Sequence, residues 1–238
     1  MQAPLRSCFV LVAAVVLATA PARAGILDKI RGGGASSDDK VAAGLKEALE
    51  IGTGNAVSST GKPDGFFKNA AIKILMPDKL RKLDKGLRAV GLGSQLDAFV
   101  LSMNRAAERS APSAKSIFKE ALTKMTFSDA KRILRGGDTA ATEYFRDKTS
   151  ELLTASFLPI VSSSLGEVGA TKNYKDLVGR YSALPLVSAP SLDLDQYVTG
   201  KSLEGLFHML GEEERKIRKD PAARVTKLLK DVFSQSGR

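Results

Sequence analysis

Hydrophobic positions along most of the chain recur every three or four residues, which is the repeat of an amphipathic helix. In "DDKVAAGLKEALE", Val41, Leu45 and Leu49 are spaced four apart and follow acidic residues, which favour a helix start. Comparable stripes recur farther along the chain, within residues 80–90, 96–107, 117–125, 139–161 and 202–233. The pattern predicts a mostly α-helical chain, a multi-helix bundle of about eight to ten helices.

Local signals predict where several of these helices begin and end. Pro77 and Pro112 stand at helix starts, where the missing N–H of proline has no intrahelical partner to lose. Two pairs resemble capping boxes, namely Ser94 with Asp97 and Thr126 with Asp129. Asp138 is expected to cap the longest helix, and Pro159 inside that helix is expected to kink or break it.

Two short segments depart from the helical repeat. In "IKILMP", Ile72, Ile74 and Met76 alternate with other residues, and Leu192 and Leu194 alternate with aspartates. Alternation is the strand pattern, and a lone strand leaves backbone groups unpaired. We therefore expect one short two-stranded β ladder, residues 71–76 with 191–196, across the helical bundle.

A Pro-Asp-Gly turn precedes the first of these segments, in "GKPDGFF" (61–67). The turn reverses the chain and is expected to leave Asp64 near the surface. Phe66 and Phe67 are then expected to fill the space beneath the ladder, with the following segment as a possible wall of a pocket.

The amino-terminal residues have the pattern of an export signal. Arg6 precedes the apolar run "CFVLVAAVVLATA", and "ARA" before Gly25 is a cleavage signal. We predict a signal peptide at 1–24, cleaved after Ala24, a flexible Gly/Ser-rich leader at 25–37, and a single helical domain at 38–238. The only cysteine, Cys8, lies in the signal, so the mature periplasmic chain would be cysteine-free.

The charge balance favours an anionic partner. The chain has 36 Lys and Arg against 26 Asp and Glu, a net charge of +10. Loss of a signal that carries Arg6 and Arg23 and no acid would leave +8. A basic exported protein tends to associate with anionic envelope components. The amphipathic segment 221–233 is expected to close the bundle, and the alternative is peripheral association with an anionic membrane. Nucleic acid is not expected, because no basic motif is interleaved with aromatic residues.

Several motifs together resemble one family. They are "GKPDGFF", "MNRAAE" (103–108), "GGDTAATEYFR", "FLPIV" (157–161), "LDLDQYVTGKSLEGLF" (192–207) and "IRKDPAAR" (217–224). The chain resembles, over about residues 40–233, the exported bacterial proteins of the domain-of-unknown-function family DUF4197. The resemblance implies a Gram-negative periplasmic or lipid-anchored protein, and it implies no activity.

The composition leaves little catalytic chemistry open. His208 is the only histidine, and a transition-metal site needs several nitrogen or sulfur ligands, so no metal and no cofactor is expected. Asp193 and Asp195 lack the spacing of a calcium loop. Two-carboxylate hydrolysis remains as an enzymatic alternative, with Asp64, Asp138 and Glu143 as its acids. Otherwise Asp138 is a helix cap and Glu143 a surface acid.

Polar residues near the same motifs form a candidate ligand-binding surface. "GGDTAATEYFR" resembles an anion-binding helix start, although a capping Asp138 would occupy its N–H groups. Arg105 with Tyr144, Arg146 and Lys148 either surrounds a ligand or forms ion pairs with Glu108 and Glu143. The complete candidate set is Lys62, Asp64, Phe66, Phe67, Arg105, Asp138, Glu143, Tyr144, Arg146 and Lys148.

Export, positive charge and the scarcity of catalytic residue types favour a non-enzymatic periplasmic binding or interaction protein. It would engage a cell-envelope ligand or partner, either an anionic component or an apolar ligand, through a basic, Phe-lined surface. The alternatives are a carboxylate-dependent hydrolase of an envelope polymer and a structural assembly subunit, which would present a large exposed apolar patch. The oligomeric state is left open.

Overall fold

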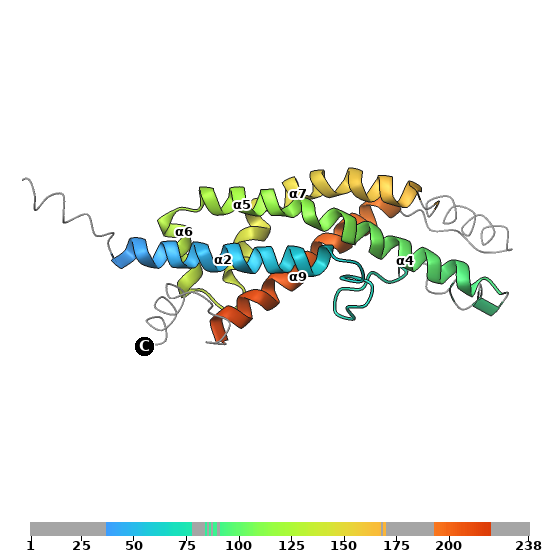
Figure 1. Cartoon of the computed structure of the whole chain (residues 1–238), viewed down its shortest axis with the longest axis horizontal. Helices are drawn as coiled ribbons and strands as arrows, with labels where there is room; N and C mark the ends of the chain where they lie inside the picture. Colours follow the sequence, from blue (N-terminus) through green and yellow to red (C-terminus); the bar gives the residue numbers. More distant parts are fainter. Residues whose placement is uncertain are drawn as a thin grey trace, which may run out of the picture. The chain divides into compact units, whose positions relative to one another are not determined.

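The computed structural model describes residues 37–77, 84, 86, 88–89, 91–167, 169 and 193–219. These residues form helices and no strand, which confirms the mostly α-helical prediction (Figure 1). The elements are α2 (Ser37–Gly61), α4 (Gly93–Ser110), the 3₁₀-helix η1 (Ala111–Ser113), α5 (Ala114–Lys124), α6 (Phe127–Arg135), α7 (Ala140–Glu167) and α9 (Leu194–Lys219). The predicted signal peptide, most of the leader and the amphipathic segment 221–233 lie outside the described residues.

Helix α9 packs along three of the other helices. It contacts α2, α4 and α7, while α4 also packs against α7, and α2 against α5 and α6 (Figure 1). Its apolar residues recur at helical spacing, so that Val198, Leu206 and Leu210 are all buried. None of the helices in the described ranges combines the length and apolar character needed to cross a membrane.

The buried side chains form two large apolar clusters. The first joins α2, α5, α6, α7 and α9. Within it the ring centroid of Phe118 lies 5.2 Å from that of Phe145 and 6.2 Å from that of Phe207, both edge-to-face. Such aromatic pairs stabilise a core by about 0.5–1.5 kcal/mol beyond area burial.

The second cluster joins the 62–77 loop, which follows α2, to α4, α7 and α9. Its members are Phe66, Ile72 and Ile74 of the loop, Phe99, Met103, Ala106 and Ala107 of α4, Val161 and Leu165 of α7, and Leu194 and Val198 of α9. The loop is therefore part of the core. Its position is fixed by three helices.

The local helix signals had mixed outcomes. Helix α2 begins at Ser37, and Thr126 with Asp129 forms the predicted capping box. Ser94 makes no cap, because α4 already starts at Gly93 and Asp97 binds Arg88 instead. Helix α7 continues through Pro159, and the prediction of a break there is wrong. Buried residues on both sides of the proline, Phe157 and Val161, hold the helix against the core.

The predicted β ladder of 71–76 with 191–196 is wrong. Leu194, Asp195 and Gln196 form the first turn of α9, and Asp193 accepts a hydrogen bond from the Gln196 N–H at 3.0 Å. The Leu-Asp-Leu-Asp alternation is thus a helix start with an aspartate beside it. The two segments do pack together, since Ile72 and Leu194 share one apolar cluster. Residues 191–192 lie outside the described part.

Candidate binding site

The Pro-Asp-Gly turn makes a tight exit from α2. The N–H of Gly65 donates to the carbonyl of Lys62 at 2.9 Å, and Asp64 adopts a positive φ of 66°. A Cβ on Gly65 would come within 3.0 Å of three backbone carbonyl oxygens. Only glycine fits this position, so the turn in "GKPDGFF" fixes how the next residues leave the helix.

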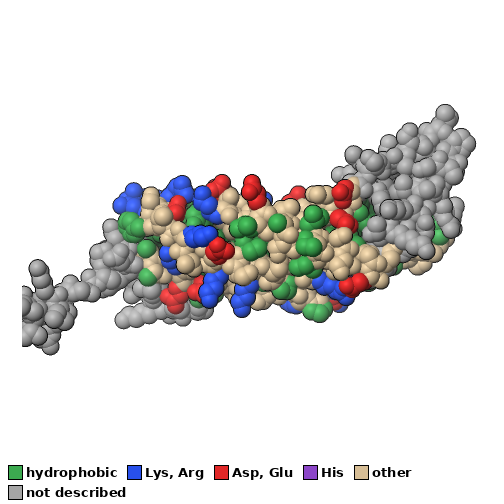
Figure 2. All heavy atoms as spheres, turned by 90° about the horizontal axis from the view of Figure 1, so that it is seen from above, with side chains coloured by type: hydrophobic (Ala, Val, Ile, Leu, Met, Phe, Trp, Pro, Cys, Tyr) green, Lys and Arg blue, Asp and Glu red, His purple; other side chains and the backbone are tan. Residues whose placement is uncertain are grey.

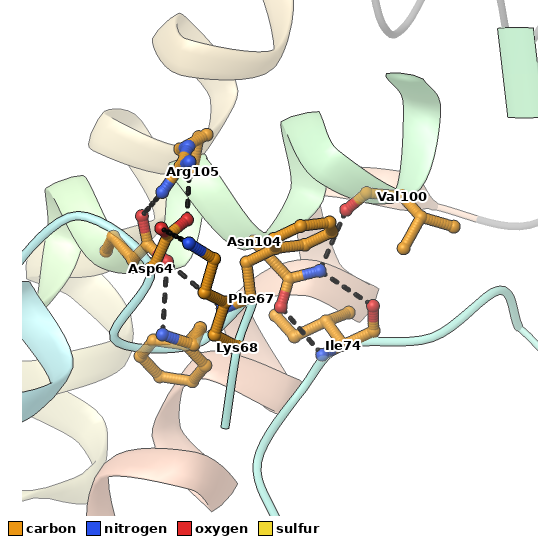
Figure 3. Close-up of polar contacts among 9 residues, drawn as sticks. Asp64, Phe67, Lys68, Ile74, Val100, Asn104 and Arg105 are labelled. Atoms are coloured by element: carbon orange, nitrogen blue, oxygen red, sulfur yellow. Dashed lines mark hydrogen bonds and ion pairs between the residues drawn. The ribbon is translucent and has the colours of Figure 1, made fainter. Parts of the chain in front are cut away.

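A buried carboxylate of α4 holds the turn in place. Oε1 of Glu108 accepts from the N–H groups of Phe66 and Phe67, both at 3.1 Å. Its other oxygen is 2.6 Å from Arg105, and Arg105 also binds Asp64 at 2.7 Å (Figure 3). Lys68 completes the network, 2.8 Å from Asp64. Bonds from Lys68 first, and then from Arg105, lower the pKa of Asp64 below its ordinary value.

The two adjacent phenylalanines point in different directions. Phe66 is fully buried, as predicted, and packs against Gly205 of α9. Phe67 is only partly buried. Its ring lies 4.1 Å from the ammonium of Lys73 and 5.9 Å from the guanidinium of Arg105. Phe67 is therefore a partly exposed ring that makes cation–π contacts, rather than a second core residue.

Residues 73–77 follow a turn at 71–72 and belong to no helix or strand. The side-chain amide of Asn104 accepts from the Ile74 N–H at 2.9 Å and donates to the Ile74 carbonyl at 2.8 Å (Figure 3). One amide side chain thus supplies the pair of hydrogen bonds that a neighbouring strand would supply. Ile72 and Ile74 are buried, whereas Leu75 is 61% exposed. The alternation, which predicted a strand, instead reflects alternating burial of these side chains in a segment that pairs with no strand.

Two grooves lie against this extended segment. Groove A, about 630 Å³, is lined by Phe67, Lys73, Leu75, Met76, Asp84, Arg88, Asp97 and Val100. Groove B, about 430 Å³, is lined by residues 71–76 together with Tyr197, Lys201, Glu204, Gly205 and His208 of α9. Both volumes are within the usual range for small-molecule sites. The sequence hypothesis of a pocket wall at this segment matches the geometry.

The charges of groove A are unequally compensated. Arg88 binds Asp84 at 2.8 Å and Asp97 at 2.6 Å, and it lowers the pKa of Asp97. Lys73 forms no ion pair within 4 Å of a described carboxylate, although its charge also acts on Asp97 from a greater distance, and its ammonium rests on the Phe67 ring. Lys73 is thus the cation of this groove that is available to a ligand anion.

The predicted site residues divide among several places. Lys62, Asp64, Phe66, Phe67 and Arg105 come together in and around the loop. The predicted cluster of Arg105 with Tyr144, Arg146 and Lys148 does not form. Arg146 lies 4.6 Å from the ring centroid of Phe207 instead. Tyr144 and Lys148 line a separate pocket of about 180 Å³, where burial raises the pKa of Tyr144.

The start of α7 is capped by another helix. Glu214 of α9 accepts from the N–H of Ala141 at 2.9 Å and from the N–H of Thr142 at 2.8 Å. The expected Asp138 cap is therefore wrong. Asp138 pairs with Lys219, which lowers its pKa. The anion-binding helix start is real, but its anion is a carboxylate of the same chain.

The acids weighed for hydrolysis do not converge. Asp64 is in the loop network, Asp138 pairs with Lys219, and Glu143 accepts a hydrogen bond from the Thr139 hydroxyl at 3.1 Å. Within the described ranges, no three His, Cys, Asp or Glu side chains gather closely enough to hold a metal ion.

Sequence reasoning missed two residues, Asn104 and Glu214, whose side chains hydrogen-bond the backbone of another segment. Both are buried polar residues on the apolar face of a helix, 0% and 4% exposed. A polar residue that interrupts a buried stripe is the signal that could have identified them, because a buried polar group needs a partner. The sequence did not say which partner.

Comparison with known proteins gives one result. A sequence model of a protein family, described as "Protein of unknown function (DUF4197)", matches residues 35–234. No curated protein and no solved structure matches the chain.

Proposed function

Because the chain belongs to the DUF4197 family of proteins of unknown function, we propose a role from its own residues: it is a non-enzymatic binding protein of the bacterial cell envelope. We place its ligand in groove A and identify it as an amphiphilic anion, such as a single-chain fatty acid. The export signal expected from the sequence would deliver the protein to the periplasm, where such ligands occur.

The observation that carries this proposal is the position of Lys73. Its ammonium lies over the Phe67 ring, lines groove A, and has no carboxylate partner among the described residues. Hydrogen bonds to a charged group contribute about 1.5–3 kcal/mol. An acidic headgroup at Lys73 would therefore gain an interaction that the free protein does not already make.

The apolar part of the ligand has a matching surface. Leu75, Met76 and Val100 line the same groove as the Phe67 ring. Leu75 is 61% exposed, and its cover by an acyl chain would remove apolar surface from water. An acid head at Lys73 and a chain along these residues describe an amphiphile better than a polar metabolite.

The general basic character of the chain contributes less than this local arrangement. Figure 2 shows Lys and Arg side chains interspersed with Asp and Glu on one face of the molecule. At physiological ionic strength, salt screens the attraction between exposed charges beyond about 8 Å. We therefore assign anion preference to Lys73, and we keep peripheral attraction to the envelope as a secondary effect.

The alternatives have less support. The three acids weighed for hydrolysis lie in separate ion pairs or hydrogen bonds, so no two-carboxylate site is assembled from them. An assembly subunit would need a continuous apolar patch. The large exposed hydrophobic residues of the described part are Leu75, Phe127 and Leu152, which lie on the loop, α6 and α7.

A fluorescent fatty acid tests the proposal directly. Delipidated protein would be titrated with dansyl-labelled undecanoic acid, and the emission should shift to the blue with saturable binding. We expect Lys73→Gln to weaken binding about tenfold, since it removes a charged hydrogen bond. Phe67→Ala should weaken binding as well.

Lys68→Gln is the matched control. Lys68 belongs to the same loop, but it binds Asp64 and does not line groove A. Its removal should leave the affinity unchanged, and thermal melts would check that each variant is folded. No binding by the wild type, or an equal loss in Lys73→Gln and Lys68→Gln, would refute the proposal.

A further inference from the structure

We propose that groove B is a docking site for an extended peptide that pairs with the backbone of residues 73–75. This site lies on the α9 side of the extended segment, and its ligand differs in kind from that of groove A. The inference goes beyond the proposed function and does not depend on it.

The argument begins with the backbone groups of this segment. Ile74 directs both its N–H and its carbonyl to Asn104 of α4. The carbonyl of Leu75 accepts from the Tyr197 hydroxyl of α9 at 3.0 Å. Across a trans peptide bond the carbonyl and the N–H point in opposite directions. The Lys73 carbonyl and the Leu75 N–H therefore point away from Asn104, toward the α9 side where groove B lies.

Two of these groups have no partner within the described residues. They are the carbonyl of Lys73 and the N–H of Leu75. The N–H of Lys73 is already used, since it donates to Asn69 at 2.8 Å. The unpaired acceptor and the unpaired donor flank Ile74 on the groove side, in the arrangement of an open strand edge.

Parallel strand pairing uses this arrangement. In a parallel ladder, one residue donates its N–H to the carbonyl before the facing residue and accepts from the N–H after it. The N–H of a single peptide residue opposite Ile74 could therefore bind the Lys73 carbonyl, and its carbonyl could accept from the Leu75 N–H. The Asn104 amide makes the equivalent pair of bonds on the other edge, so the segment is already held in an extended form.

The groove has suitable size and lining for such a strand. Its volume is about 430 Å³, and Ala71 and Gly205 contribute little side-chain bulk. Lys201 is paired with Glu204 at 2.6 Å, and the Lys73 ammonium rests over the Phe67 ring of groove A. The open backbone groups of Lys73 and Leu75 are therefore what favours an extended peptide in groove B.

Amide exchange and peptide selection test the inference. Random heptapeptides displayed on phage would be selected against the protein, and an enriched peptide would be synthesised. In the free protein the Ile74 amide should exchange slowly and the Leu75 amide rapidly. Addition of the peptide should slow Leu75 exchange by at least about tenfold and leave Ile74 little changed.

Two variants separate this site from groove A. His208 is exposed and lines groove B only, so His208→Trp should block the peptide and leave fatty-acid binding unchanged. Leu75→Ala retains the backbone N–H and should still bind the peptide. The inference is overturned if no heptapeptide is enriched over the His208→Trp protein, or if a bound peptide leaves the Leu75 exchange rate unchanged.

Discussion

The contact between Phe66 and Gly205 predicts opposite effects for two identical substitutions in α9. A Cβ on Gly205 would lie within 3.0 Å of Phe66 Cε1, 3.1 Å from its Cζ and 3.2 Å from Ile72 Cβ. Phe66 is fully buried, so its ring has no open space to move into. Gly200 is in the same helix, and a Cβ there would meet nothing within 4 Å.

The expected magnitudes follow from two separate terms. Replacing glycine by alanine inside a helix stabilises by about 0.8–1.0 kcal/mol. Overpacking a core costs about 1–3 kcal/mol. Gly200→Ala should therefore raise the free energy of unfolding by about 1 kcal/mol, and Gly205→Ala should lower it by up to about 2 kcal/mol. The difference between the two variants isolates the steric term, because helix propensity cancels.

Urea unfolding followed by circular dichroism at 222 nm measures both effects. The midpoint should shift in opposite directions with an unchanged slope. Gly205→Ala should cost less in a Phe66→Leu background, because the smaller side chain makes room for the new methyl group. If both alanine variants stabilise the protein equally, Phe66 does not pack against α9 and the placement of the loop is wrong.

Three further predictions concern polar contacts. Asn104→Ala leaves the N–H and the carbonyl of Ile74 unpaired and should lower the free energy of unfolding by about 2–4 kcal/mol in urea. The control Asn55→Ala loses one surface hydrogen bond to Glu213 and should lower it by less than about 0.5 kcal/mol. Equal losses would contradict the role of the Asn104 amide. Glu214→Ala breaks a buried pair and should cost about 3–5 kcal/mol, while Glu212→Ala, in a surface pair with Arg215, should cost less than about 1 kcal/mol. An NMR titration should give Asp64 a pKa below the ordinary carboxyl value, and Lys68→Gln should raise it. Because the fold lowers the pKa of Asp64, the stability that this carboxylate contributes is present above about pH 4 and is lost as the pH falls through its pKa in the folded protein. An Asp64 pKa at the ordinary carboxyl value would contradict the loop network.

Local signals in the sequence predicted part of the local structure. The start of α2 and the capping box at Thr126 depend on residues within four positions of one another. The similar Ser94–Asp97 pair failed because α4 already starts at Gly93, which places Ser94 inside the helix rather than at its cap. The same short motif therefore gives different results when the helix starts at another residue.

Long-range partners could not be predicted in the same way. The alternation at 72–76 predicted a strand, but the backbone of Ile74 pairs with the side chain of Asn104, thirty residues later. A backbone pair needs a donor and an acceptor at the right spacing, and a side-chain amide supplies both. Likewise the cap of α7 comes from Glu214, more than seventy residues after the helix starts. Nothing in the composition of either segment distinguishes such a partner.

The late position of α9 in the chain has a consequence for biosynthesis. Because this helix contacts α2, α4 and α7 and supplies the carboxylate that caps α7, a chain made from its amino terminus cannot close its core until residues 194–219 have emerged. Until then the faces of α2 and α7 that α9 covers stay open to chaperones and proteases. Nascent chains that are halted before Leu194 should accordingly be degraded quickly, whereas chains that extend past Lys219 should acquire protease resistance in one step.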